Sequence, residues 1–379
     1  MVPVNSEGEK PKKTIKFSII ISLALSLGII FAVLYLTVDA DTIDKLSSTN
    51  IRYEFFAIAI CLNCIYWFVW GWRLKILANE IGENVNISLW KSTKIVIANM
   101  FLAGITPSMA GGEPVRIYLL NKEGMSLGCS TAAVLGERLL DAIFMLICVP
   151  FAFLFFRGFI NSNSANFDST VVNYLNWGLG IGVVFFSILL ALFAYTIIRP
   201  GKIKRFLIWI NKKLSRFFKK KEKTNKIVER INTEVDNFHS SMKCLGGSGR
   251  KSLLKASIVT AIFWSSGFLI PSMILMGLGF PPYFLESFAA QILLLIIIML
   301  PLTPGSAGVA DVSVAGLYSG MVGTGEGSLI GVFVLLYRFV SYHMNLIAGA
   351  IFQYRIFKSV ASFSMDMIQK KDEIKKCED

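Results

Sequence analysis

The residues with the most unusual placement in this sequence are charged side chains inside long apolar stretches. They are Glu113, Arg116, Glu137, Arg138, Asp141, Asp311 and Arg338. A charged side chain at the centre of a bilayer costs about 2.5–3.5 kcal/mol on the insertion scale, so each must pair, line a wet cavity or lie near the interface. Helical spacing favours pairing, because Arg138 and Asp141 stand three residues apart, as do Glu113 and Arg116. We therefore expect an ionic cluster within the membrane.

The chemistry that suits these groups is the binding of an anion. A guanidinium stays charged at any relevant pH and can hold a phosphate through two parallel N–H groups. Helices that begin after Gly112 and Gly308 would add free backbone N–H groups. Arg116, Arg138 and Arg338 could thus hold a lipid phosphate, while the carboxylates orient the arginines or take up a proton in the unloaded site. A purely structural ion-pair network is the alternative.

The composition limits the class of protein that positions these residues. Of 379 residues, 54% are hydrophobic and only 17% are charged, which excludes soluble, disordered and fibrous classes. Helices are the expected elements, because lipid satisfies no backbone polar group. The net charge of +13 favours anionic membrane lipids over nucleic acid as partners. With scattered cysteines and only His239 and His343, we expect no metal centre and no cofactor.

The apolar runs predict an all-α polytopic membrane protein with about six full transmembrane helices, each of roughly 20 residues or more. The runs are Phe17–Val38, Phe55–Leu77, Ser126–Phe156, Trp177–Ile198, Leu253–Leu278 and Leu329–Phe357. The first could be a signal peptide, but its length favours a retained helix. Two further apolar regions, Ser92–Leu120 and Phe284–Tyr318, are broken by Pro and Gly. We expect each to form a re-entrant helical hairpin.

The distribution of charge predicts the orientation in a cell membrane. The segment 39–54 is net acidic and should lie outside. The amino terminus is basic, and the tail carries Lys370, Lys371, Lys375 and Lys376, so both ends should be cytoplasmic. The expected divisions are a cytoplasmic amino terminus (1–16), a first membrane half (17–198), a basic cytoplasmic loop (199–252), a second membrane half (253–357) and a cytoplasmic tail (358–379). The basic loop could lie on the membrane surface or be an ordinary loop.

An internal repeat relates two units, about 53–157 and 251–357. The recurring features are Thr106–Gly111 with Thr303–Gly308, Trp67 with Trp264, and Arg138 with Arg338. Each unit is expected to contain a span, a hairpin and a charged span, and the predicted topology makes the two units opposite in orientation. Inverted repeats with broken helices are typical of transporters, with the substrate near the midplane and alternating access around it. A duplicated scaffold without transport is the alternative.

The motifs resemble those of the lysylphosphatidylglycerol synthase transmembrane-region family, whose members are often called flippase-like integral membrane proteins. Residues Gly112–Arg116 are similar to the family's G-E-x-x-R pattern, and Glu137–Asp141 to its E-R-x-x-D pattern. The looser match is Pro304–Gly308, where Ser306 replaces a glycine. The predicted substrate-binding residues are Gly112, Glu113, Arg116, Glu137, Arg138, Asp141, Pro304, Gly305, Gly308, Asp311 and Arg338.

The resemblance implies lipid translocation rather than lysylphosphatidylglycerol synthesis. We expect a non-enzymatic protein that moves a phosphate-bearing lipid, either a phospholipid or a polyprenyl-phosphate-linked lipid, between leaflets. One alternative is a transporter of a small organic anion. Another is a scaffold for a cytoplasmic enzyme that modifies lipids or glycans, docked through the basic loop. A membrane enzyme acting on lipid phosphates is the least favoured, because no metal-binding carboxylate cluster or paired histidine motif is recognisable.

Overall fold

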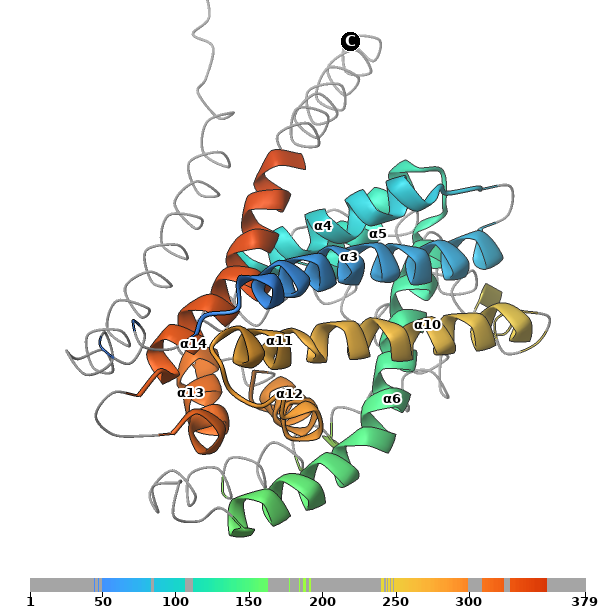
Figure 1. The fold of residues 1–379 in the computed structure, drawn as a ribbon. Coiled ribbons are helices and arrows are strands. Elements are labelled where there is room, and N and C mark those ends of the chain that lie inside the picture. Colours follow the sequence, from blue (N-terminus) through green and yellow to red (C-terminus); the bar gives the residue numbers. More distant parts are fainter. Residues whose placement is uncertain are drawn as a thin grey trace, which may run out of the picture.

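The computed structural model describes residues 44, 47, 50–82, 85–105, 112–162, 177, 184, 187, 188, 191, 240, 241, 243, 245, 247, 249–298, 309–323 and 328–352. Every element in this part of the chain is a helix (Figure 1). The elements are α3 (Tyr53–Ile81), α4 (Leu89–Ile105), α5 (Gly112–Lys122), α6 (Leu127–Ser162), α10 (Arg250–Phe268), α11 (Ile270–Gly277), α12 (Phe284–Ile298), α13 (Val309–Val322), α14 (Ile330–Arg338) and the π-helix η2 (Phe339–His343).

Four helical stretches are long and apolar enough to cross a membrane. They are Tyr53–Ile81, Leu127–Ile160, Arg250–Gly277 and Ile330–Phe352. Each coincides with one of the predicted spans, so the protein is an all-α, multi-pass membrane protein. The predicted span 17–38 lies outside the described residues, as does nearly all of 177–198. The predicted cytoplasmic segments 1–16 and 358–379, and most of the basic loop, also lie outside them.

The outer faces of the long helices carry large apolar side chains where a soluble protein would carry polar ones. On α6, the side chains of Phe151 and Leu154 are 72% and 67% exposed. Other exposed apolar residues are Ile58 and Phe68 on α3, Leu254 and Ile258 on α10, and Ile347 and Ile351 on the last helix. Contiguous apolar surface of this kind is stable only against another apolar medium, so these faces contact lipid.

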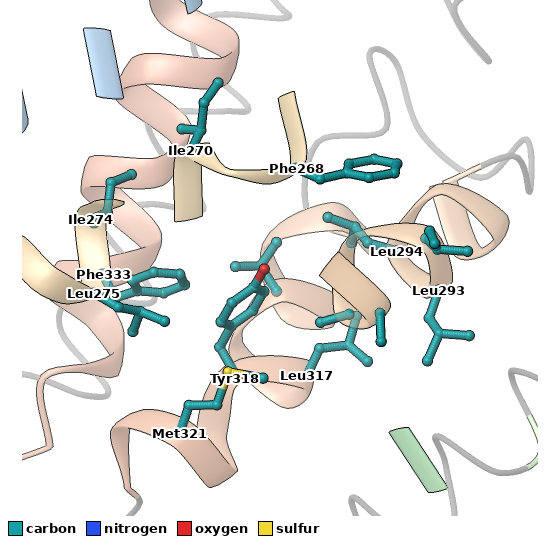
Figure 2. Close-up of a cluster of buried hydrophobic side chains, with 14 of the residues drawn as sticks. Phe268, Ile270, Ile274, Leu275, Leu293, Leu294, Leu317, Tyr318, Met321 and Phe333 are labelled. Atoms are coloured by element: carbon teal, nitrogen blue, oxygen red, sulfur yellow. The ribbon is translucent and has the colours of Figure 1, made fainter. Parts of the chain in front are cut away.

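The interior has two main apolar clusters. One joins α6 to α11–α14 and contains Tyr318 packed beside Phe333 and Leu275 (Figure 2). The buried Tyr318 hydroxyl lies 2.9 Å from the Ser287 hydroxyl and accepts an N–H from Gln291 at 3.0 Å, so it remains hydrogen-bonded inside the core. The second cluster joins α3, α4, α5, α6 and α10. It surrounds the charged residues described below.

The first helices of the two units, α3 and α10–α11, pack against each other in opposite directions (Figure 1). The backbone N–H of Arg52, before α3, donates to the carbonyl of Gly277, at the end of α11, at 3.0 Å. At the other end the Ser252 hydroxyl donates to the Glu80 carboxylate at 2.6 Å. The contacts between these ends keep the same register: Tyr66 with Gly267, and Arg73 with Thr260. The pair is therefore antiparallel along its length.

Helix α10 ends at Phe268 and α11 begins at Ile270, where the sequence predicts one unbroken span. The cause of this break is Pro271, which stands in the first turn of α11. Proline has no backbone N–H to donate, and its ring clashes with the carbonyl one turn earlier, so the helix cannot continue unchanged through it. The stretch still spans Arg250–Gly277 as a single apolar unit.

The two broken apolar regions form pairs of short helices. Helix α4 packs on α5, and α12 packs on α13. These helices have 17, 11, 15 and 14 residues, and each is shorter than the roughly 20 residues of a full crossing. Residues 106–111 and 299–308, which join the two members of each pair, lie outside the described residues. The re-entrant path of the two hairpins stays a prediction.

Candidate functional site

The charged residues of the first half form one continuous group of ion pairs, which we call the arginine cluster. Its members are Arg73 from α3, Glu113 and Arg116 from α5, and Glu137, Arg138 and Asp141 from α6. Five of the six are predicted site residues, and the structure brings them together from helices far apart in the sequence. The predicted pairing of these charges is therefore present in this half, and the depth of the cluster in the membrane stays a prediction.

The centre of the arginine cluster is fully buried. The Arg73 Nε donates to Glu137 Oε1 at 3.0 Å, and its Nη1 donates to Asp141 Oδ1 at 2.5 Å. The Arg116 Nη1 donates to the other Glu137 oxygen at 2.5 Å. The side chains of Arg73, Arg116 and Glu137 are 0% exposed. Glu137 is thus held between two guanidinium groups, which compensate the loss of water around its charge.

The outer end of the arginine cluster is more open. Arg138 Nη2 donates to Glu113 Oε1 at 2.5 Å, and Arg138 Nη1 approaches Asp141 Oδ2 at 3.5 Å. The side chain of Arg138 is 39% exposed and that of Glu113 is 34% exposed. A group that enters from outside the helix bundle would meet this pair first.

The charges in the arginine cluster balance. Three arginines face three carboxylates, so the group carries no formal net charge when all six residues are ionised. Burial of unpaired charges costs several kcal/mol each, whereas a well-paired network offsets much of this penalty. The cluster is therefore compatible with a low-dielectric interior, and any added charge would disturb its balance.

Aromatic side chains enclose the buried centre of the arginine cluster. The Arg73 guanidinium lies over the Phe263 ring at 4.6 Å from its centroid, and Arg116 lies over Trp70 at 5.3 Å. The Trp264 indole N–H donates to Asp141 Oδ1 at 3.0 Å. Cation–π contacts of this kind are strongest where water is excluded. Helix α10 of the second half thereby supplies part of the enclosure of a first-half cluster.

Arg116 has N–H groups to spare. Its Nε and Nη2 are buried without a hydrogen-bond partner among the described residues, and so is the Trp70 indole nitrogen that belongs to the ring beside it. A buried donor that lacks a partner costs about 1–3 kcal/mol, so these groups favour a ligand that accepts hydrogen bonds.

Gly112 lets the start of α5 approach α4, because a Cβ there would lie 2.5 Å from Asn99 Oδ1.

In the second half, Arg338 from α14 forms an ion pair with Asp311 from α13. Its guanidinium also lies over the Tyr342 ring at 5.1 Å, and its Nη2 has no hydrogen-bond partner among the described residues. The pair joins elements that correspond to those of Arg138–Glu113, namely the last long helix of the unit and the second of its two short helices. The other predicted residues of this half, Pro304, Gly305 and Gly308, lie outside the described residues.

A π-helix follows Arg338 directly and accepts contacts from the first half. Asn63 on α3 donates to the Val340 carbonyl at 2.9 Å, and the Trp67 indole donates to Asn345 Oδ1 at 2.7 Å. Trp67 and Trp264, which correspond in the predicted repeat, thus each donate an indole N–H to a side chain from the other half. Single-turn π-helices are frequent at functional sites, because they release backbone carbonyls from the regular pattern.

Sequence reasoning missed Arg73, the most connected residue of the arginine cluster. It stands near the end of the predicted span Phe55–Leu77, where an arginine would reach the interface. In the structure the helix continues to Ile81, which places Arg73 inside the bundle. One signal was available: the predicted first-half residues held three carboxylates but only two arginines. A third cation had to be near if all were buried together.

Comparison with known proteins gives consistent results. The family described as "Lysylphosphatidylglycerol synthase TM region" matches residues 19–349. A "UPF0104 membrane protein" of Archaeoglobus fulgidus is 36% identical over 307 residues, which cover 80% of this chain and 87% of the relative. Another, of Methanocaldococcus jannaschii, is 27% identical over 304 residues, covering 80% and 84%. The chain therefore belongs to the lysylphosphatidylglycerol synthase transmembrane-region family.

Proposed function

We propose that this protein moves a phosphate-bearing lipid between the two leaflets of the membrane, by alternating access and without covalent chemistry. The observation that carries the proposal is the buried, charge-balanced arginine cluster, in which Arg116 retains unpartnered N–H groups and Arg138 is partly exposed. Membership in a family named for a lipid synthase's membrane region supports a lipid as the substrate.

The chemistry of the free groups favours a phosphate. Arg116 Nε and Nη2 are adjacent donors on one planar guanidinium, and two acceptor oxygens of a phosphate match such a pair. A carboxylate of a small organic anion would match the donors equally well. The exposed apolar faces of the surrounding helices favour a substrate that arrives through the lipid phase. The acyl or prenyl chains could then remain in the membrane while the headgroup enters the bundle.

The arrangement of the two units supports alternating access. Each unit has a long helix, two short helices packed together, and a second long helix that bears an arginine paired with the second short helix. The first helices of the two units pack antiparallel, which is the relation expected of an inverted repeat. Transporters with such repeats move one bundle against the other around a site near the midplane. Six full crossings and two re-entrant hairpins belong to this proposal.

A leaflet-exchange assay tests the proposal. Proteoliposomes with the full chain would contain fluorescent phosphatidylglycerol, phosphatidylethanolamine or a polyprenyl phosphate, and a membrane-impermeant reductant would report each lipid's appearance in the outer leaflet. We expect exchange of at least one of these lipids, and a loss of at least about tenfold in Arg138→Ala, the equivalent of roughly 1.4 kcal/mol.

Arg157→Ala is the matched control, since Arg157 is an exposed arginine on the same helix, away from the arginine cluster. It should exchange lipid at the wild-type rate. Size-exclusion profiles and thermal stability would establish that both variants are folded. Wild-type protein that accelerates none of the lipids would contradict the proposal, and so would equal rates in wild type and a folded Arg138→Ala.

A further inference from the structure

The three carboxylates of the arginine cluster differ in how firmly they are held. Glu137 accepts from Arg73 and Arg116 and is 0% exposed. Asp141 accepts from Arg73 at 2.5 Å and from the Trp264 indole at 3.0 Å. Glu113 has one ion-pair partner among the described residues, Arg138, and its side chain is 34% exposed. Of the three, Glu113 is the carboxylate most easily released.

Among the described residues of α4, α5 and α6, no second cation forms an ion pair with Glu113. On α6 the charged groups nearby are Arg138 and the carboxylates Glu137 and Asp141, and on α5 itself Arg116 is bonded to Glu137. The lysines of α4 lie near its amino-terminal end, and both have other partners. Lys91 pairs with Glu123 at 2.7 Å, and Lys94 lies over the Trp90 ring.

A lipid phosphate that enters the arginine cluster would upset its charge balance. The cluster is neutral without a ligand, so a phosphodiester would leave one uncompensated negative charge in a region of low dielectric constant. The phosphate would also compete with Glu113 for Arg138, the more exposed of the arginines. Both effects favour the neutral form of Glu113 once the phosphate is bound.

We propose that binding of the lipid phosphate is coupled to the uptake of one proton by Glu113. The phosphate takes over the Arg138 N–H groups, and the released carboxylate takes a proton from water and becomes a carboxylic acid. The proton leaves again when the lipid leaves, so the loaded and unloaded sites are both neutral. This inference rests on the proposed function and names the proton as the ion coupled to lipid transport. The proton binds when the lipid enters the site, and not while the site is unloaded.

Among the described residues of the second half, no carboxylate corresponds to Glu113 in both its ion pair and its exposure. The corresponding pair, Arg338 with Asp311, has side chains that are only 7% and 0% exposed. A proton from water could not reach Asp311 as readily as it reaches Glu113. The coupling is therefore assigned to the first half alone, and the two halves are functionally unequal in spite of the repeat.

Isothermal titration calorimetry on the full chain in a non-ionic detergent measures the coupled proton directly. The probe is a short-chain phosphatidylglycerol below its micellar concentration, because its phosphodiester does not titrate near neutral pH. Titrations at one pH in several buffers with different ionisation enthalpies give the number of protons taken up per lipid bound. We expect close to one proton for wild type and close to none for Glu113→Gln, which imitates the protonated carboxyl and should still bind the probe.

The matched control is Glu123→Gln, one residue beyond α5, whose carboxylate is 31% exposed and paired with Lys91. It should take up one proton, as wild type does. The pH dependence of the dissociation constant gives a second measure, and its wild-type part needs no variant to fold. The wild-type dissociation constant should rise about tenfold per pH unit where one proton is coupled, whereas that of Glu113→Gln should change by less than about twofold.

Binding of the probe to wild type without proton uptake would overturn this inference and leave the proposed function standing. Equal proton uptake in wild type and in folded Glu113→Gln would do the same, because the proton would then go elsewhere. If the short-chain phosphatidylglycerol does not bind to wild type at any pH tested, the inference is overturned, and the leaflet-exchange assay decides separately whether the proposed function survives with another lipid.

Discussion

Arg73 is a single residue that joins three helices through its side chain. Its guanidinium bonds to Glu137 and Asp141 on one neighbouring helix and reaches the Thr260 hydroxyl at 3.4 Å on another. It therefore ties α3 to α6 and α10 at a depth where water cannot replace it. A buried ion pair adds little stability in comparison with apolar residues of the same volume, but removal of one partner leaves an uncompensated charge.

We expect Arg73→Ala to lower the free energy of unfolding by about 3–5 kcal/mol, because it leaves two buried carboxylates without their shared cation. Thermal and denaturant unfolding in detergent would measure the change. Arg52→Ala is the control, since Arg52 pairs with Glu54 where the side chains are 49% and 60% exposed. That surface pair contributes about 0–1 kcal/mol. Similar costs for the two substitutions would contradict the assigned role of Arg73.

The Trp264 indole supplies a second residue-scale test. Trp264→Phe keeps an aromatic ring in the same place but removes the N–H that donates to Asp141. A hydrogen bond to a charged group is worth about 1.5–3 kcal/mol, so we expect a loss of stability of this size. Trp177→Phe, at a tryptophan that is 76% exposed, should cost far less. Equal unfolding midpoints for both variants and wild type would show that the indole bond contributes nothing.

At this scale the sequence predicted most of the arginine cluster, because ionisable residues in apolar runs are rare and conspicuous. Spacing also predicted the pair Arg138 with Asp141, which the structure shows at 3.5 Å, but it did not predict the pairs between helices. The spacing suggested Glu113 with Arg116 on one helix, whereas the structure joins Glu113 to Arg138 and Arg116 to Glu137. Pairing across helices depends on how the helices pack, and the spacing of residues within one helix does not predict that packing.

At the scale of elements, α3 and α4 approach closely because Gly71 has no side chain. A Cβ at this position would lie 2.4 Å from the Thr93 hydroxyl oxygen and 2.8 Å from the Thr93 backbone. Backbone atoms cannot rotate away as a flexible side chain can, so any larger residue must push the two helices apart. Arg73 lies two residues further along α3, so a shift of α3 away from α4 would also move Arg73.

We therefore expect Gly71→Ala to destabilise the protein by about 1–3 kcal/mol, the usual cost of overpacking. Gly158→Ala is a matched substitution on α6, where a new Cβ would meet nothing within 4 Å. Alanine has the higher helix propensity, so Gly158→Ala should be neutral or stabilising by up to about 1 kcal/mol. Chemical denaturation of the two variants beside wild type would measure both effects. A neutral Gly71→Ala would show that α3 and α4 can separate without cost.

The elements themselves were predictable in number and order where apolar runs are long. Four predicted spans and the two pairs of short helices occur in the described residues. Local departures were not predicted: the break at Leu269 before Pro271, and the π-helix after Arg338. A proline marks a bend without fixing its size. Within the π-helix, the Val340 carbonyl accepts a hydrogen bond from Asn63, which comes from a helix remote in the sequence.

At the scale of the whole molecule, the predicted inverted repeat requires the two halves to have opposite orientations in the membrane. Helices α3 and α10–α11 run antiparallel over their full contact, from Arg52 beside Gly277 to Glu80 beside Ser252. If both cross the membrane, the start of α3 and the end of α11 lie on the same side. The basic residues around α10 then predict which side, because positive segments favour the cytoplasm.

Cysteine accessibility tests this orientation. The variants are made in a background without the six native cysteines. Tyr53 follows the acidic segment 39–52, and Pro281 follows α11. We expect Tyr53→Cys and Pro281→Cys to react with a membrane-impermeant maleimide on intact cells. Lys251→Cys, at the start of α10, should react only after permeabilisation. All three positions are exposed in the structure, so a lack of labelling reports the membrane rather than burial. Labelling of Tyr53→Cys and Lys251→Cys from the same side would contradict a membrane-spanning antiparallel pair, and with it the inverted repeat on which alternating access depends.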